Sequence, residues 1–187
     1  MIVKIISVVC VLITGVMSFV PAGHSSEVEI MAVPVTGQIY MITGEGGNIG
    51  LFIGAEGTFL IDDLFGPLTD RFVAVIKSVG GDFPKFLINT HYHGDHTGGN
   101  ENLGQGGTLI FSHDNVRERL STGYTIVEFG MKQKAISPKG LPVVTFSEDI
   151  SFHLNGDSVH AIHVPHSHTD GDSFIHFKSA NVIHAGD

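Results

Sequence analysis

The chain has 187 residues and a formal net charge of −9, from 10 lysines and arginines against 19 aspartates and glutamates. This acidic balance argues against nucleic acid as a partner, because few basic side chains are present to neutralise phosphates. A single cysteine, Cys10, excludes a disulfide scaffold and a zinc finger. The 24 glycines and 12 histidines predict many tight turns and point to metal binding or acid–base chemistry.

Residues 1–22 have the three-part layout of a secretory signal peptide. Lys4 gives a positive start, an apolar run extends from Ile5 to Val20, and small residues surround Ala22, after which we expect cleavage. The alternative is an uncleaved N-terminal anchor, although the run is shorter than the roughly 20 residues that span a bilayer. Cleavage would leave residues 23–187 as one secreted or periplasmic domain without stable membrane insertion.

Short β-like runs alternate with glycine-rich turns from residue 28 onward. The segments that predict strands are 38–43, 48–53, 58–61, 85–90, 108–111, 143–146, 149–154, 158–164, 173–177 and 181–184. No internal repeat, low-complexity tract or linker divides them. Residues 23–187 are therefore predicted to form one α/β domain, with strands concentrated at its two ends.

Two segments have the spacing of a helix. The first is 67–79, which Gly80 ends. A second helix is predicted to follow Ser112 as its cap and to extend through Leu120. The segment 121–142 is punctuated by glycine and proline, so we expect a loop or a mobile arm there. The residues that share the apolar face of the first helix are Leu68, Phe72, Val75, Ile76 and Val79.

The strongest functional signal is the run THYHGDHTGGN at residues 90–100, which begins where an apolar strand ends. In an extended segment His91 and His93 point the same way, so two imidazoles can reach one metal ion. The glycine that follows allows a sharp turn, which frees Asp95 and His96 to face a second position. Such a ligand set suits Zn²⁺ first, with Fe or Mn as open alternatives. The other interpretation, a solvated histidine-rich loop, is disfavoured by the preceding strand.

The sequence HYHGDH followed by TGG resembles the HxHxDH signature of the metallo-β-lactamase superfamily. Three further motifs occur in the family's order. FLID at 59–62 resembles its strand-end aspartate, HTDGD at 168–172 resembles its HTxG element, and HAGD at 184–187 resembles its strand-end GD. The resemblance extends from about residue 36 to Asp187 and implies the family's αββα sandwich.

The resemblance also implies a ligand set. It assigns His91, His93 and His168 to a first metal ion, Asp95 and His96 to a second, and Asp187 to a bridge between them. Asp62 would orient the ligand loop from behind. Asp95 is also a candidate hydrogen-bond partner of the nucleophile. One or two Zn²⁺ per chain would supply a hydroxide that attacks a carbonyl carbon.

Two places depart from the family's pattern around the HTxG element. Asp170 and Asp172 stand where the family usually has Pro and often has Ser. They either serve the turn by accepting backbone hydrogen bonds or take part in substrate choice. His166 is an alternative to His168 as ligand, although the family spacing favours His168. Tyr92, between two ligands, is predicted to pack beneath the loop rather than contact substrate.

A larger departure lies at the end of the chain. The family's last metal ligand is a histidine in a later segment, typically PGHG, and the sequence stops at Asp187 without one. We therefore expect the second half of the αββα fold to be truncated. A weak second metal site and an unpaired sheet edge would result.

The leading hypothesis is a secreted zinc-dependent hydrolase that attacks an ester, thioester or lactam carbonyl of a small-molecule substrate. It would resemble hydroxyacylglutathione hydrolases or β-lactamases. The alternative is a non-catalytic, truncated fragment that binds metal without turnover. A flavodiiron-like oxidoreductase is disfavoured, because that branch usually has an acidic residue where His93 stands. The substrate, the metal in the cell and the oligomeric state stay open.

Overall fold

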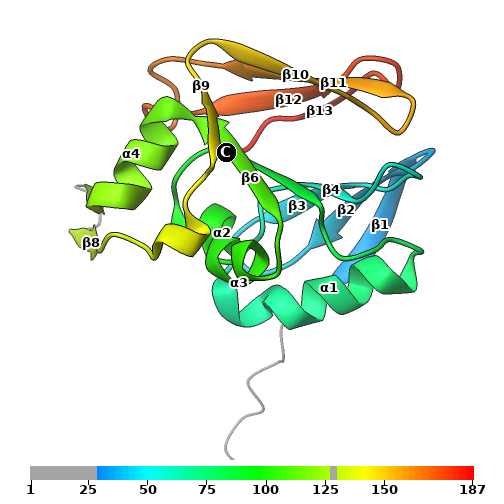
Figure 1. Ribbon diagram of the computed structural model, residues 1–187, viewed down its shortest axis with the longest axis horizontal. Coiled ribbons are helices and arrows are strands. Elements are labelled where there is room, and N and C mark those ends of the chain that lie inside the picture. Colours follow the sequence, from blue (N-terminus) through cyan, green and yellow to red (C-terminus); the bar gives the residue numbers. More distant parts are fainter. Residues whose placement is uncertain (1–28, 127–129) are drawn as a thin grey trace, which may run out of the picture.

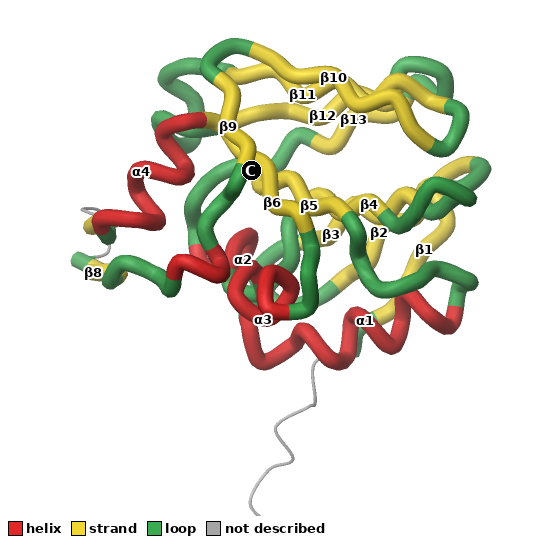
Figure 2. The backbone as a smooth tube through the Cα atoms, in the orientation of Figure 1, coloured by secondary structure: helices red, strands yellow, loops and turns green. Residues whose placement is uncertain are grey.

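Figure 1 shows the computed structural model, which describes residues 29–126 and 130–187. Two β-sheets lie face to face, and helices cover the outer side of the larger sheet (Figures 1 and 2). Within these ranges no helix lies over the outer side of the smaller sheet. The predicted α/β fold class is confirmed, whereas the predicted signal peptide, residues 1–22, lies outside the described residues.

The larger sheet has seven strands in the order β1-β2-β3-β4-β5-β6-β9. Strands β1 to β4 are antiparallel neighbours, whereas β4, β5, β6 and β9 run parallel. The carboxyl ends of β4, β5 and β6 therefore meet at one edge of the sheet, where α/β proteins usually bind ligands. The strands are β1 (Met31–Thr36), β2 (Ile39–Thr43), β3 (Asn48–Phe52), β4 (Phe59–Ile61), β5 (Phe86–Asn89), β6 (Leu109–His113) and β9 (Val144–Phe146).

The smaller sheet has four antiparallel strands in the order β10-β11-β12-β13. They are β10 (Asp149–Leu154), β11 (Asp157–His163), β12 (Ser173–Phe177) and β13 (Val182–His184). The connection from β11 to β12 is longer than a tight hairpin turn. This connection, the loop 164–172, reaches back toward the larger sheet, where the backbone N–H of Ser173 donates a hydrogen bond to the carbonyl of Thr90.

Helices and a small hairpin complete the described part of the chain. They are η1 (Gly66–Leu68), α1 (Thr69–Ser78), α2 (Gly94–Thr97), α3 (Asn100–Gln105), α4 (Asp114–Thr122), η3 (Pro138–Gly140) and the hairpin of β7 (Tyr124–Ile126) with β8 (Met131–Gln133). Within residues 29–126 and 130–187, no helix is long and apolar enough to cross a membrane.

Alternation along the central strands divides the core into two layers. Leu60 of β4 packs with Phe72 and Ile76 of α1 on the helix side of the sheet. Its neighbours Phe59 and Ile61 point the other way, into the space between the sheets. There the ring of Phe59 contacts that of Phe152 at a centroid distance of 5.0 Å. Apolar contact between the two sheets therefore holds β4, and the residues after it, in place.

Most of the predicted strands and the helix at 67–79 are present, but three expectations need correction. Strand β1 and the short helices α2 and α3 were not predicted. Ser112 does not cap α4, because it belongs to β6; instead the ring Nδ1 of His113 accepts the backbone N–H of Asn115. The segment 121–142, predicted as a loop or mobile arm, contains the β7–β8 hairpin and η3.

Candidate metal centre

Both sheets deliver side chains to one place. The residues after β4 and β5, together with α2, reach it from the larger sheet. The loop 164–172 and the residues after β13 reach it from the smaller sheet. The predicted site residues delivered in this way are Asp62, His91, His93, Asp95, His96, His168 and Asp187.

Five of these side chains form two groups that could each hold a metal ion. The first comprises His91, His93 and His168, and the second comprises His91, His96 and Asp187. Within each group the ligand atoms all lie within 4.8 Å of one another. The Nε2 atom of His168 is 3.0 Å from Nδ1 of His93. Nitrogen atoms this close, converging from separate segments, are the arrangement that a shared cation would require.

The carboxylate of Asp187 lies between the two groups. Its Oδ1 is 3.1 Å from Nε2 of His96, and its Oδ2 is 3.6 Å from Nε2 of His168. Asp95 lies at the rim, outside both groups, with its Oδ2 3.7 Å from Nε2 of His96. The loop that contains Gly46 closes over this rim. A Cβ atom at Gly46 would stand 2.6 Å from Cβ of Asp95, so only glycine fits there.

A buried network behind the histidines fixes their orientation. Asp62 accepts a hydrogen bond from the backbone N–H of Thr90 at 2.7 Å and another from the Thr90 hydroxyl at 2.8 Å. The same carboxylate lies 2.8 Å from Nδ1 of His96. Since the Thr90 proton points to Asp62, its oxygen is left to accept from Nδ1 of His91, 3.0 Å away. One carboxylate therefore sets the tautomer of two histidines, directly and through Thr90.

Two buried nitrogen atoms remain without a hydrogen-bond partner among the described residues. They are Nε2 of His91 and Nε2 of His96. The Nε2 atom of His96 lies near Asp187, but without hydrogen-bond geometry. An unpartnered buried imidazole nitrogen is costly unless something binds it. Because Nδ1 of His91 already donates to Thr90, the Nε2 lone pair of His91 is free for a metal ion, whereas Nε2 of His96 becomes available once it loses its proton. The donor set of histidines and carboxylates fits zinc.

The pKa values of the histidines differ within the site. Burial lowers the pKa of His91 to about 4, and burial with the nearby His168 lowers that of His93. Both rings are therefore neutral near pH 7, which is the form that binds metal. Burial also lowers the pKa of His96, but the hydrogen bond and charge of Asp62, with Asp187 and Asp95, outweigh it and raise the pKa to about 9. A metal ion at His96 would have to displace a proton.

The other sequence candidates have different places. His166 is exposed, has a left-handed φ of 58°, and belongs to neither metal group. The Tyr92 ring packs against Tyr124 at a centroid distance of 4.6 Å, as the packing interpretation predicted. Asp172 serves the turn, since it accepts hydrogen bonds from the Thr169 backbone and hydroxyl. Asp170 instead forms an ion pair with Arg119.

Sequence reasoning missed two supporting residues. Thr90 directly precedes His91, and the only sequence signal for its role was its position at the end of a predicted strand. Arg119 carried no signal, because it lies 51 residues from its partner Asp170 and the chain path that joins them is visible only in three dimensions.

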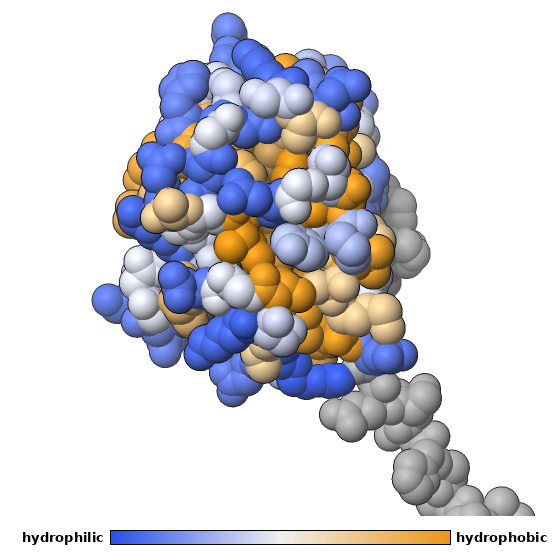
Figure 3. Space-filling view, turned by 90° about the vertical axis from the view of Figure 1, so that its right-hand side faces the viewer, coloured by the Kyte–Doolittle hydropathy of each residue, from blue (hydrophilic) through white to orange (hydrophobic). Residues whose placement is uncertain are grey.

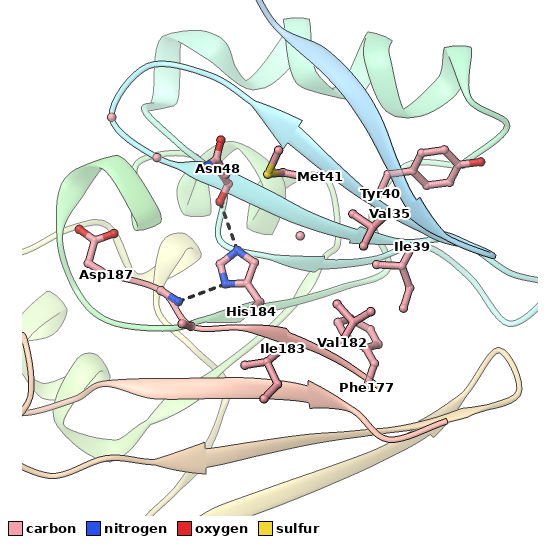
Figure 4. Close-up of a pocket in the computed structure, with 15 residues that line it drawn as sticks. Val35, Ile39, Tyr40, Met41, Asn48, Phe177, Val182, Ile183, His184 and Asp187 are labelled. Atoms are coloured by element: carbon pink, nitrogen blue, oxygen red, sulfur yellow. Dashed lines mark hydrogen bonds between the residues drawn. The ribbon is translucent and has the colours of Figure 1, made fainter. Parts of the chain in front are cut away.

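An elongated pocket of about 380 Å³ leads away from the centre between the two sheets. Asp187 lies at one end of it, and Val35, Ile39 and Val182 lie at the other (Figure 4). His184 crosses between the sheets, since its Nε2 is 3.4 Å from the carbonyl oxygen of Asn48. On the face turned to the viewer in Figure 3, hydrophobic side chains gather in a band between hydrophilic areas.

The fold is similar to that of several solved structures. One is the native FEZ-1 metallo-beta-lactamase from Legionella gormanii, with a TM-score of 0.69, 19% identity, and coverage of 79% of this chain and 57% of that one. Another is GOB-18 from Elizabethkingia meningoseptica, with a TM-score of 0.67, 20% identity, and coverage of 79% and 55%. BJP-1 of Bradyrhizobium japonicum has a TM-score of 0.66, 20% identity, and coverage of 78% and 56%.

At these identities the structural likeness concerns the fold, and the chain spans little more than half the length of the proteins it matches. The family rests on the sequence itself. A model of the metallo-beta-lactamase superfamily matches residues 42–187, which is most of the chain. The motifs expected from the resemblance fall within that range and meet at one centre. The chain belongs to the metallo-beta-lactamase superfamily.

Proposed function

We propose that the protein is a zinc-dependent hydrolase of small-molecule substrates with an ester, thioester or lactam carbonyl. The observation that carries the proposal is the pair of buried Nε2 atoms on His91 and His96, which have no hydrogen-bond partner among the described residues. They face a carboxylate, Asp187, that lies between two groups of ligand atoms. A site of this kind does not benefit the fold, because unpaired buried nitrogen atoms cost stability.

The proposed ligands divide between two ions. His91, His93 and His168 would hold the first, Asp95 and His96 would hold the second, and Asp187 would contribute its carboxylate to both. When bound, zinc supplies a nucleophile by lowering the pKa of water toward ~7 and polarises the carbonyl of the substrate. Asp62 and Thr90 keep the Nδ1 protons in place, so that both Nε2 lone pairs face inward. Asp95, at the rim, would accept a hydrogen bond from the attacking water.

The substrate class is inferred from the surroundings as well as the family. The pocket that begins at Asp187 is lined mainly by apolar side chains, which suits an organic acyl group rather than a polyanion. The similar solved proteins are named as metallo-beta-lactamases. A β-lactam and an acylglutathione thioester are therefore the two probes to test first. Residues 1–22 support a secreted or periplasmic location.

One observation favours a second candidate function, a one-metal protein without turnover. The second ligand group shares His91 with the first, and Asp95 stands outside it. His96 and Asp187 are then the only unshared ligand-forming side chains of that group. Two ligands hold a divalent ion weakly, since structural and catalytic zinc sites use three or four protein ligands.

Zinc content and hydrolysis separate the two candidates. We expect about two zinc ions per chain after loading and dialysis, together with hydrolysis of a chromogenic β-lactam or an acylglutathione. His91→Ala should abolish the activity and lower the zinc content, because this residue belongs to both groups. His153→Ala, a change at an exposed histidine on β10, is the control. One zinc without turnover supports the second candidate, and hydrolysis that survives His91→Ala refutes a metal-centred reaction.

A further inference from the structure

The loop 164–172, which carries His168, is fastened to one face of α4. The side chain of Arg119 donates to both carboxylate oxygens of Asp170, with Nε 3.5 Å from Oδ1 and Nη2 in contact with Oδ2. One turn earlier on the helix, the amide Nδ2 of Asn115 donates to the backbone carbonyl of Asp170 at 2.6 Å. Residues four apart share a helix face, so Asn115 and Arg119 both bind the same loop residue, Asp170, from adjacent turns.

The next loop residue rests directly on the helix. A Cβ atom at Gly171 would lie 2.8 Å from Cγ2 of Val116 and 3.2 Å from its backbone nitrogen. Glycine therefore permits an approach that a larger residue would prevent. Inside the loop, Asp172 accepts hydrogen bonds from the backbone and hydroxyl of Thr169. His168 thus precedes a short turn whose shape is fixed internally and whose position is fixed by α4.

His168 has little else to hold it. Its side chain is 38% exposed, and its close polar neighbours are His93 and Asp187, which are themselves proposed ligands. Its ring also contacts those of His91 and His93, at centroid distances of 5.0 Å and 4.8 Å. All of these contacts are with other proposed ligands, so the backbone of the loop is what connects His168 to the rest of the fold.

Resting on the proposed function, we infer that Arg119 is a positioning residue, which acts through Asp170 to hold His168 at the first metal position. Its helix follows β6 of the larger sheet, whereas His168 lies in the loop that connects β11 and β12 of the smaller sheet. The ion pair therefore aligns a ligand from one sheet with His91 and His93 from the other. Partners outside the ligand shell commonly change metal affinity about 10- to 100-fold. A partly exposed ion pair that acts through a loop should change the metal affinity by a smaller factor.

The test is zinc affinity, measured by competition with a chromophoric chelator. Arg119→Gln should weaken binding to the first site about three- to tenfold. Arg119→Lys, which keeps the charge but loses the paired geometry, should recover part of the loss. The double exchange Arg119→Asp with Asp170→Arg should recover more. Arg117→Gln is the matched control, because Arg117 on the same helix contacts the carbonyl of Pro142 instead of the loop.

Two further readouts distinguish positioning from general damage. Added salt should narrow the difference in affinity between the natural chain and Arg119→Gln, because it screens a partly exposed ion pair. In the metal-free protein, the backbone amides of Thr169 and Gly171 should exchange hydrogen faster in Arg119→Gln, while the urea midpoint stays close to that of Arg117→Gln.

Equal zinc affinity in Arg119→Gln and the natural chain overturns the inference and leaves the proposed function standing. A loss of affinity that neither salt nor Arg119→Lys alters also overturns it, since the effect is then not that of an ion pair. If the natural chain and His91→Ala bind zinc equally, the proposed function fails, and the inference fails with it.

Discussion

Nδ1 of His96 lies 2.8 Å from Oδ2 of Asp62, and both side chains are almost completely buried. Burial alone would raise the pKa of Asp62, but the hydrogen bond and the charge of His96 bring it below its ordinary value of 3.8. Asp62 is therefore ionised, and its carboxylate accepts the hydrogen bond from Nδ1–H of His96. This contact gives Nε2 of His96 a fixed direction, on which the second metal group depends.

Replacing this carboxylate should impair metal binding more than folding. Asp62→Asn keeps the shape of the side chain but removes the charge and one acceptor. We expect zinc affinity at the second site to fall about 10- to 100-fold, as for other outer partners of ligating histidines. Chelator competition measures the affinity, and circular dichroism checks that the fold persists. Asp70→Asn, an exposed carboxylate on α1, serves as the control. Equal affinity in Asp62→Asn would show that Asp62 does not direct His96.

Two glycines with left-handed backbone, Gly46 and Gly107, separate the effect of backbone strain from that of contact with the metal centre. Gly46 has φ +91°, and an added Cβ would stand 2.6 Å from Asp95 and 2.9 Å from the ring of Phe65. Gly107 has a similar φ of +97° with nothing within 4 Å. Alanine at Gly107 should cost about 1–2 kcal/mol, because left-handed backbone disfavours a Cβ atom. Alanine at Gly46 should cost more, because its Cβ also meets Asp95 and Phe65.

The two substitutions should differ at the metal site. Gly46→Ala must displace Asp95 and should lower the zinc affinity of the second site, whereas Gly107→Ala should leave zinc binding unchanged. Urea unfolding gives the stability and chelator competition gives the affinity. If both variants bind zinc like the natural chain, then the position of Asp95 has no bearing on the second ion.

Much of this structure could be predicted from local sequence patterns, whereas the rest depends on contacts between residues far apart in the chain. The apolar run of β4 and the helical period of 67–79 are local patterns, so these elements were predictable. The convergence of His168 with His91 was predictable only through the family resemblance, because spacing along the chain says nothing about which loops meet. Strand β1 was missed because its side chains are mostly exposed and lack a clear alternation. The attachment of Arg119 to Asp170 has no local pattern.

The layer between the sheets should dominate stability. Phe59 is fully buried and contacts the ring of Phe152 from the opposite sheet. Phe59→Ala should lower the free energy of unfolding by about 3–5 kcal/mol through lost burial and the cavity left behind. Val143→Ala, at a side chain that is 64% exposed, should change it by less than about 0.5 kcal/mol. Urea denaturation of both variants measures the difference, and similar midpoints would contradict the assignment of Phe59 to the core.

Asp157 should make the smaller sheet sensitive to acid. Its carboxylate accepts backbone N–H groups of Ser158 at 2.6 Å, Ser179 at 2.7 Å and Ala180 at 3.1 Å. Partial burial raises the pKa of Asp157, but these three donors outweigh it and lower the pKa below 3.8. The folded state therefore favours the ionised form. Its contribution is present above about pH 4 and is lost as the pH falls through the lower, folded-state pKa.

Asp157→Asn should thus destabilise the protein by about 1 kcal/mol at pH 7. The difference from the natural chain should shrink toward zero near about pH 2. Thermal unfolding across this range measures it, with Asp82→Asn, an exposed aspartate, as the control. A difference that stays constant with pH would mean that the charge of Asp157 is not what stabilises this turn.

The division of the centre between two sheets has a consequence for the order of assembly. The network of Asp62, Thr90 and His96 is contained within the first half of the fold, so it can form as soon as β4, β5 and α2 are in place. Asp187 belongs to the far end of the chain and arrives only when β13 has paired. Contacts of such long sequence separation form late and slowly. We therefore expect the buried histidines to be aligned before the carboxylate of Asp187 reaches them, so that the complete centre forms only after the second sheet has docked.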